Sequence, residues 1–147
     1  MYTLHVINPA DWIEKIQSLI DSNWQETGLD FPFNPDIGFY NRAFDMGILF
    51  GVIAIDQNQE VVAYASVAVV PHQHNHTVLF GNNDAIFVHP DYRNSLLSGR
   101  LIKLSESEAK LRGATMFMWH CRHNTGLLDM FLKHGYHPVE SVVMGFL

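Results

Sequence analysis

The sequence has 147 residues, of which 48% are hydrophobic and 16% charged, a composition typical of one globular domain with a buried core. The net charge of −6 argues against a general nucleic-acid-binding protein, because such proteins neutralise phosphates with a basic surface. The start of the chain has neither a basic segment nor a long apolar one, and the single cysteine cannot form an internal disulfide, so we expect a cytoplasmic protein without membrane contact.

Alternating apolar patterns and turn residues predict ten elements, each helix being marked by a capping residue, a proline or a closing glycine. In chain order they are a strand over 2–7, helices from Pro9 through Ile20 and from Pro35 to about Met46, strands over 48–55, 61–70 and 84–88, a helix that follows the turn at 93–98 and ends near Gly113, a strand over 115–121, a helix over 125–134 and a strand over 139–147. This order, βααβββαβαβ, predicts a single α/β (α+β) domain over residues 1–147, with helices on both faces of a mixed, mostly antiparallel sheet of about six to seven strands.

Charge is divided unevenly along these elements. Residues 1–92 carry eleven acidic residues against Lys15 and Arg42, whereas residues 93–147 carry seven basic residues against four acidic ones. A basic half suits a ligand rich in phosphate, and an acidic half suits a cationic substrate. An uneven solvated surface is the alternative explanation.

The turn after the strand 84–88 has the features of an anion site. Backbone N–H groups at a helix N-terminus lack partners and lie at the positive end of the helix dipole, and here small residues and arginines surround them. Arg93 and Arg100 flank this turn. A plain tight connection with two surface arginines is the alternative.

The segment "VHPDYRNSLLSGRLI", residues 88–102, resembles the coenzyme-binding motif of the GNAT superfamily of N-acetyltransferases. In that family a strand ends in V-x-P-x-Y-R, and a loop Arg/Gln-x-x-Gly-x-Gly/Ala leads into a helix. The resemblance continues through "LRGATMFMWHCRHN" and "FLKHGY" and so covers nearly the whole chain. In its short length and in the segment "HPDYR" the chain also resembles bacteriophage-encoded members of the family.

The resemblance implies acetyl-coenzyme A as co-substrate and no metal. It also implies that the strands 84–88 and 115–121 are a central parallel pair that splays apart, so that the pantetheine arm can pair with exposed backbone. A backbone N–H near Phe87 or Val88 would then stabilise the oxyanion of the thioester. The implied coenzyme-binding residues are Ile86, Phe87, Val88, Arg93, Asn94, Ser95, Leu96, Leu97, Ser98, Gly99, Arg100, Asn124 and Phe131.

Three positions depart from the family pattern. Leu96 and Ser98 stand where the loop has small residues, and leucine does not allow the close approach to phosphate that glycine allows. Phe131 stands where many members have a tyrosine that protonates the leaving thiolate, and Tyr136 matches a core position. These departures support a second interpretation, a GNAT-like binding or inhibitory protein that acts on a host protein and has lost catalysis.

Acetyl transfer by direct attack in a ternary complex needs a base, because only a neutral amine attacks. Asp84 is the first candidate, since strict alternation places it on one strand face with Ile86 and Val88. A polar turn or bulge at "GNND" is the alternative. His120 and His123 are further candidates, because histidines titrate near neutrality.

The predicted partners are a cationic amine acceptor and a second copy of the chain, and neither nucleic acid nor a membrane. The predicted acceptor contacts, which offer carboxylates and aromatic rings to a cation, are Glu26, Asp30, Phe31 and Phe33.

The sequence contains two other candidate sites. The segment "HQHNH" offers three histidines at alternate positions, but on a straight strand His72 and His76 lie roughly 13 Å apart, too far to share a zinc ion unless a turn brings them together. His120 and Cys121 could form a nucleophile pair, but neighbours on a regular strand point to opposite faces. An exposed polar loop and a buried cysteine are the preferred interpretations.

Overall fold

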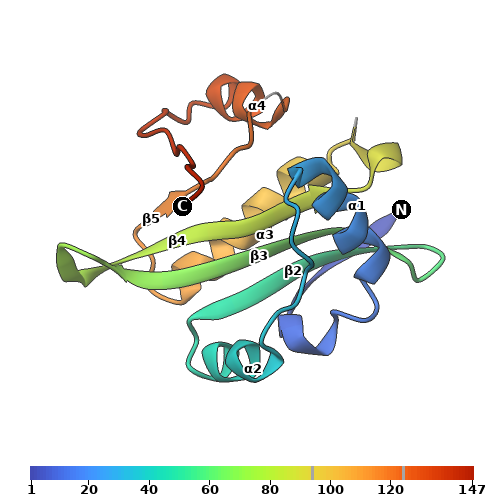
Figure 1. Cartoon of the computed structure of the whole chain (residues 1–147), viewed down its shortest axis with the longest axis horizontal. Coiled ribbons are helices and arrows are strands. Elements are labelled where there is room, and N and C mark those ends of the chain that lie inside the picture. The colour runs from blue at the N-terminus through green and yellow to red at the C-terminus, as the bar shows by residue number, and fades with distance from the viewer. Residues whose placement is uncertain (94, 124) are drawn as a thin grey trace.

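The computed structural model describes residues 1–93, 95–123 and 125–147, and the coenzyme contacts predicted for Asn94 and Asn124 lie outside these residues (Figure 1). The elements are β1 (Tyr2–Ile7), α1 (Gln17–Thr27), α2 (Ile37–Asp45), β2 (Leu49–Asp56), β3 (Val61–His72), β4 (Asn75–Val88), α3 (Leu97–Leu111), β5 (Met116–Met118) and α4 (Leu127–Lys133), with short 3-10 helices over Pro9–Asp11 and Pro90–Tyr92. No helix in this part of the chain is both long and apolar enough to span a bilayer.

One mixed sheet forms the centre of the molecule. Its strand order is β1-β2-β3-β4-β5, with antiparallel pairs throughout except for the parallel pair β4–β5. Long apolar runs in β2 and β3 explain why these strands lie in the middle, since both of their faces are covered. The prediction of a mixed, mostly antiparallel sheet is therefore confirmed.

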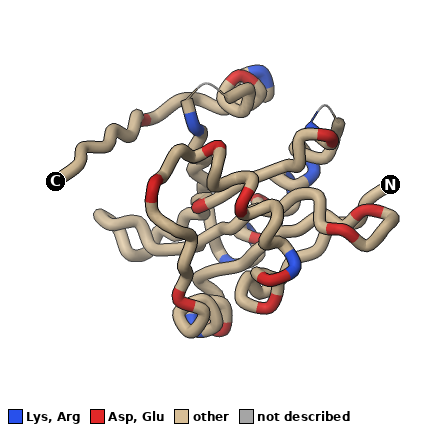
Figure 2. Tube along the Cα trace, turned by 45° about the vertical axis from the view of Figure 1, so that its right-hand side comes forward, with Lys and Arg blue, Asp and Glu red and all other residues tan. Residues whose placement is uncertain are grey.

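Helices cover both faces of this sheet, as the element order predicts (Figure 1). Ile16, Leu19 and Ile20 pack from α1 and the turn before it against Ile53 and Tyr64 on one face. On the other face α3 contributes a second apolar cluster. Its α3 members are Leu97, Leu101 and Ala109. Figure 2 shows acidic residues on several segments of the N-terminal half and basic residues near the start of α3 and on α4.

The predicted strand count was too high, because the described residues form five strands rather than six or seven. Residues 139–147, predicted as the last strand, have no strand partner there, and six of their large apolar side chains are exposed. A second difference lies near Pro9, where the predicted helix begins as a 3-10 turn and becomes α-helical only at Gln17. The predicted order is otherwise observed.

Candidate functional site

β4 and β5 lie side by side for only three residue pairs and then separate. The last pair is Asn82 with Met118. At the next position the buried side chain of Asn83 replaces backbone pairing, because its amide donates to the His120 carbonyl (3.2 Å) and its carbonyl accepts from the His120 N–H (2.6 Å). The parallel pair therefore opens beyond Asn82, as the family resemblance implies.

The opened strand presents backbone groups that β5 does not pair. The His89 N–H donates to the Val62 carbonyl of β3 (2.9 Å), so alternation turns the backbone groups of Ile86 and Val88 away from β3. The Val88 carbonyl shows this direction directly, because it accepts from Arg93 Nε (2.8 Å). By the same alternation Phe87 pairs with β3. The edge thus offers the Val88 N–H and both backbone groups of Ile86, which fits an extended chain of amides such as pantetheine.

The start of α3 offers a second set of backbone donors. Ser95 Oγ accepts from the Leu97 N–H (3.2 Å), and the first turn-to-turn helical bond runs from the Arg100 N–H to the Leu96 carbonyl (3.1 Å). Within the described residues the Gly99 N–H, which lies between these two, has no hydrogen-bond acceptor. No heavy atom of the described residues lies within 4 Å of the place a Gly99 Cβ would occupy, so this side of the first turn is not packed against other elements. Anions bind at such positions.

The two leucines at the start of α3 differ in burial. Leu97 is fully buried in the cluster beneath α3, whereas Leu96 is 76% exposed. Leu97, predicted to bind the coenzyme, therefore anchors the helix with its side chain. Leu96 occupies the place of a small residue without closing the turn.

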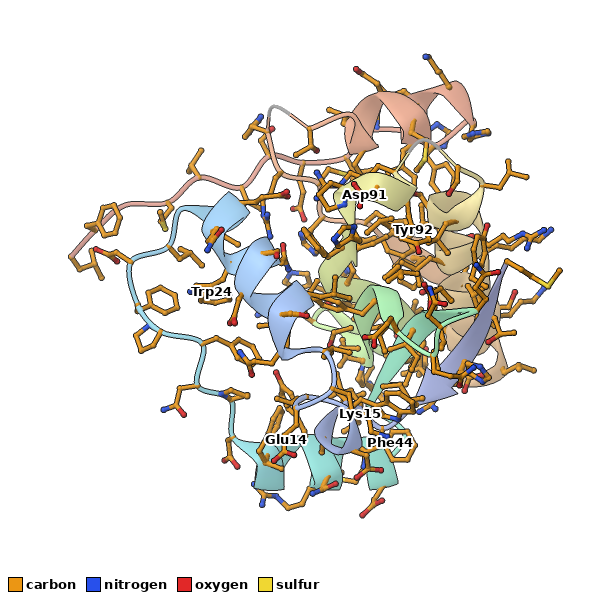
Figure 3. All side chains as sticks on the ribbon, turned by 90° about the vertical axis from the view of Figure 1, so that its right-hand side faces the viewer. Glu14, Lys15, Trp24, Phe44, Asp91 and Tyr92 are labelled. Carbon is orange, nitrogen blue, oxygen red and sulfur yellow. The ribbon has the colours of Figure 1, made fainter. Side chains whose placement is uncertain are left out.

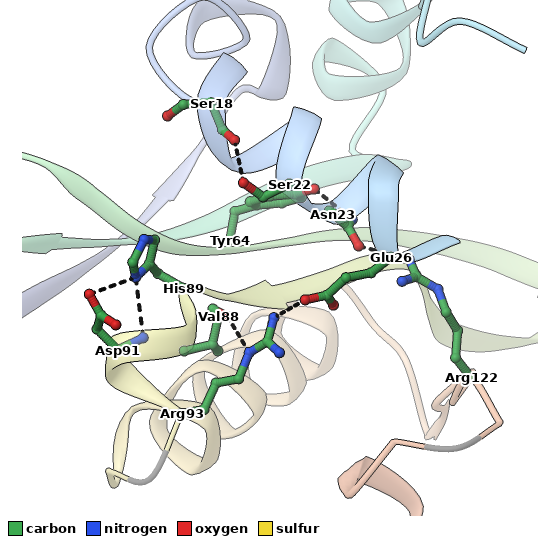
Figure 4. A network of polar contacts seen from close by, with 10 residues as sticks. All are labelled: Ser18, Ser22, Asn23, Glu26, Tyr64, Val88, His89, Asp91, Arg93 and Arg122. Carbon is green, nitrogen blue, oxygen red and sulfur yellow. Dashed lines mark hydrogen bonds and ion pairs between the residues drawn. The ribbon is translucent and has the colours of Figure 1, made fainter. Parts of the chain in front are cut away.

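Neither flanking arginine stands alone. Arg93 donates through Nη2 to Glu26 Oε1 on α1 (2.7 Å), as Figure 4 shows. Its guanidinium also lies 5.1 Å from the Phe87 ring centroid. The Arg100 guanidinium lies 5.5 Å from the centroid of Tyr2 on β1. Binding of phosphate by either arginine stays a prediction.

A cavity of about 700 Å³ lies on the α1 side of the sheet. Its walls are mostly apolar and aromatic, with a few polar groups, as in small-molecule sites. It is lined by Pro9, Ile13, Ile16, Ile20, Asn23, Trp24, Thr27, Leu29, Phe31, Pro32, Phe33, Asn34, Pro35, Tyr40, Tyr64, Ala65, Ser66, Asp84, Ala85 and Arg122.

Asp84 reaches this cavity because of a β-bulge. Ser66 pairs with Ala85 and Val67 with Asn83, so Asp84 is an extra residue in β4. The predicted shared face with Ile86 and Val88 is therefore wrong. Those two side chains pack beneath α3, while Asp84 lines the cavity beside Ala85.

A chain of hydrogen bonds crosses the cavity floor. The buried Asn23 side chain donates to the Tyr64 hydroxyl (2.7 Å) and accepts from Arg122 Nη2 (2.8 Å), as Figure 4 shows. Burial raises the pKa of Tyr64 to about 12, against the opposing effects of Asn23 and Arg122. Burial and, secondly, the charge of Asp84 raise the pKa of Tyr40. Both hydroxyls are therefore protonated at neutral pH.

The predicted acceptor contacts are only partly brought together. Phe31 and Phe33 line the cavity, whereas Glu26 pairs with Arg93 and Asp30 does not line it. Trp24 of α1 (Figure 3), which is not among the predicted contacts, lines the same cavity, and its ring centroid lies 5.6 Å from that of each phenylalanine.

The histidine candidates for the base lie elsewhere. His120 is exposed and contacts Asn83 through its backbone, and neither it nor His123 lines the cavity. The polar residues missed by sequence reasoning are Asn23, Tyr40, Tyr64 and Arg122. Tyr64 alone has a signal in the sequence, a polar hydroxyl within the apolar run of β3.

Phe131 belongs to an aromatic stack rather than to the open strand edge. It is buried, with ring centroids 5.5 Å from Trp119 and 4.8 Å from Tyr136. Glu106 on α3 accepts from Trp119 Nε1 (2.9 Å) and from the Tyr136 hydroxyl (2.7 Å). Burial, followed by Glu106, raises the pKa of Tyr136 to about 12. Tyr136 thus has a structural role and holds its proton toward Glu106.

The two alternative sites gain no support. Burial raises the pKa of the Cys121 thiol, which disfavours the nucleophilic thiolate. His72 Nδ1 accepts from the His74 N–H (3.2 Å) at the tip of the β3–β4 hairpin. Across residues 1–93, 95–123 and 125–147, no three histidine, cysteine or acidic side chains gather as metal ligands would.

Comparison with known proteins agrees with the geometry of the opened strand pair. A family model described as acetyltransferase (GNAT) family matches residues 13–136. A comparison with curated protein sequences gives no match.

Solved structures show the same fold at low identity. A ribosomal-protein-alanine N-acetyltransferase from Brucella melitensis biovar Abortus 2308 superposes with a TM-score of 0.74 at 15% identity, over 99% of both chains. A predicted acetyltransferase with acetyl-CoA from Clostridium acetobutylicum gives 0.77 at 17% identity, over 99% of this chain and 96% of that one. An aminoglycoside antibiotic 6'-N-acetyltransferase from Acinetobacter baumannii gives 0.73 at 18% identity, over 100% and 98%.

Proposed function

Because this chain belongs to the acetyltransferase (GNAT) family, we propose that it moves an acetyl group from acetyl-coenzyme A to an amine by direct attack in a ternary complex. One juxtaposition carries the proposal. The open backbone edge at Ile86 and Val88 and the cavity at Asp84 and Ala85 lie on consecutive residues of β4. A thioester on that edge and an amine in the cavity would therefore meet at the bulge.

Different groups of the chain would bind different parts of acetyl-coenzyme A. When bound, this co-substrate supplies an activated acetyl thioester. The N–H groups of Ser98 and Gly99 would bind its pyrophosphate, since they point out of the helix N-terminus. Ile86 and Val88 would pair with the pantetheine amides. The Ile86 N–H, on the part of this edge nearer Asp84, would stabilise negative charge on the thioester carbonyl oxygen, with Val88 left to the pantetheine arm.

Asp84 is the proposed base, and the observation that supports it is its place in the cavity wall beside the open edge. Its carboxylate would take a proton from the acceptor amine, directly or through a water molecule. His120, the other catalytic candidate, lies outside the cavity, so we propose no catalytic role for it. The protonated Tyr40 and Tyr64 would orient the acceptor by hydrogen bonds.

One observation favours the second candidate function, a binding protein that has lost catalysis. Arg93, which stands at the arginine of the coenzyme motif, is engaged by Glu26. In such a protein the ion pair would serve stability and the coenzyme would not bind. A second copy of the chain as partner, a cytoplasmic setting and a bacteriophage source stay predictions from the sequence.

A titration of the whole chain with acetyl-coenzyme A separates these two functions. Ligand at about 100 times its dissociation constant should stabilise the fold by roughly 2.7 kcal/mol, seen as a higher melting temperature. Release of free coenzyme A thiol in the presence of a set of amines then measures turnover. Binding with turnover supports the acetyltransferase, whereas the absence of both supports the binding protein.

A further inference from the structure

Two opposite charges face the same cavity without neutralising each other. Asp84 comes from β4 and Arg122 from the segment after β5, and both line the cavity. Neither forms an ion pair with another described residue. Tyr64 lies close enough to both for each to act on its pKa, in opposite directions. The cavity thus has one negative and one positive position around a common tyrosine.

Arg122 is held in place by a neutral partner. Its Nη2 donates to Asn23 Oδ1 (2.8 Å), and Asn23 is itself fixed by Tyr64. A guanidinium has five N–H donors, so most remain for a ligand, and its charge is not offset as that of Arg93 is by Glu26. An anchored guanidinium with spare parallel donors suits a carboxylate, which it can bind in bidentate fashion.

Much of the remaining cavity wall is apolar. Trp24 donates through Nε1 to the Phe31 carbonyl (2.7 Å), which fixes its ring beside Phe31 and Phe33. Ile13 and Ile20 continue this wall. A small apolar or aromatic side chain can be buried there, whereas a polyhydroxylated ligand would find few hydrogen-bonding groups.

We propose that the acceptor is an α-amino acid with an apolar or aromatic side chain, with its amine at Asp84, its carboxylate at Arg122 and its side chain against Trp24. The inference rests on the proposed acetyl transfer. In the reaction the amine nitrogen bonds to the acetyl carbon as the thioester C–S bond breaks, sulfur keeps the bonding pair, and Asp84 takes the proton that nitrogen loses. An amine without a carboxylate would leave Arg122 without a partner, and its positive charge would be repelled by the guanidinium. No additional residue is therefore needed to exclude such an amine.

Three compounds with one skeleton test this inference: phenylalanine, its amide and 2-phenylethylamine. We expect the native protein to acetylate phenylalanine with a kcat/KM at least tenfold above that of the other two, because only phenylalanine pairs with Arg122. In Arg122→Gln this preference should fall at least tenfold, mainly through KM for phenylalanine. Lys110→Gln removes an exposed charge of α3 outside the cavity and should keep the preference.

The outcomes separate this inference from the proposed function. Equal or better acetylation of 2-phenylethylamine, or an unchanged preference in Arg122→Gln, overturns the amino-acid acceptor while acetyl transfer stands. If no amine is acetylated, calorimetry with phenylalanine decides the site. Binding that Arg122→Gln weakens at least tenfold supports the amino-acid site without the transfer, and no binding overturns it. Melting curves confirm that each variant is folded.

Discussion

Arg93 and Glu26 form an ion pair, with Nη2 and Oε1 2.7 Å apart, that joins the turn before α3 to the end of α1. The sequence predicts different ligands for these two residues, the coenzyme phosphates for the arginine and a cationic acceptor for the glutamate. Both side chains are about two-fifths exposed, at 41% and 43%. An ion pair this exposed adds little stability. A ligand that breaks it therefore loses little binding free energy.

The first prediction concerns this pair. If Arg93 binds a coenzyme phosphate, it must leave Glu26, and an exposed pair is worth up to roughly 1 kcal/mol. Glu26→Gln should therefore tighten acetyl-coenzyme A binding by up to about fivefold at low salt, with a melting temperature close to that of the native protein. Calorimetry measures the dissociation constant. Glu14→Gln, an equal charge change at another exposed position, should not give this gain. Weaker binding in Glu26→Gln would mean that the pair itself shapes the coenzyme site.

The second prediction concerns the proposed base. Asp84→Asn keeps the shape of the cavity wall but cannot accept a proton, so kcat should fall by about 10² to 10⁴. Acetyl-coenzyme A affinity should stay nearly constant, because the coenzyme would be held by backbone groups of other residues. His120→Gln is the matched control and should keep native turnover. Should the histidine variant lose activity while Asp84→Asn retains it, the base lies on the segment after β5.

The regular parts of the fold could be predicted from the sequence because local and long-range signals agree there. The β2–β3 hairpin has two apolar runs around a polar turn, and α3 follows a turn of small polar residues and ends before Gly113. The last strand could not be judged in this way. Residues 139–147 have strand-like composition, but a strand also needs a neighbouring strand, and none of the strands in the described part of the chain pairs with them.

The site was less predictable, for two physical reasons. A bulge adds one residue to β4 within "GNND", as the alternative interpretation of this segment has it, whereas strict alternation assigned Asp84 to the wrong face. Hydrogen bonds between distant residues have no local pattern either. Asn23 and Arg122 are 99 positions apart, and each alone is an ordinary polar residue. The splayed pair was predicted only because the family resemblance supplied it.

The third prediction concerns the aromatic stack around Phe131. A tyrosine there would place a hydroxyl in a buried position between Trp119 and Tyr136, so Phe131→Tyr should lower the free energy of unfolding by about 1 to 3 kcal/mol. We expect no gain in kcat, because the ring lies in the core. Denaturant unfolding and thiol release measure the two effects. A higher kcat in Phe131→Tyr would show that this position reaches the leaving thiolate after all.

The last prediction uses Tyr64, whose hydroxyl accepts from the buried Asn23 amide. Tyr64→Phe leaves that donor without its partner and should lower the free energy of unfolding by about 1 to 3 kcal/mol at neutral pH. Burial raises the pKa of Tyr64 from 10.0 to about 12, so the folded protein holds this proton more tightly than the unfolded chain does. The stabilisation tied to the proton is complete below pH 10 and is lost as pH rises from 10 toward 12.

Denaturant unfolding at several pH values checks both effects of Tyr64→Phe. The fall in stability above pH 10 should be shallower in this variant than in the native protein, since one of its proton-linked groups is gone. Tyr136→Phe is the comparison, because the pKa of Tyr136 is also about 12 but its ring is more exposed and its hydroxyl bonds Glu106. If the free energy of unfolding of Tyr64→Phe falls with pH in parallel with that of the native protein, Tyr64 has the same affinity for its proton in the folded and unfolded states. The hydrogen bond to Asn23 would then be the whole contribution of the Tyr64 hydroxyl to stability.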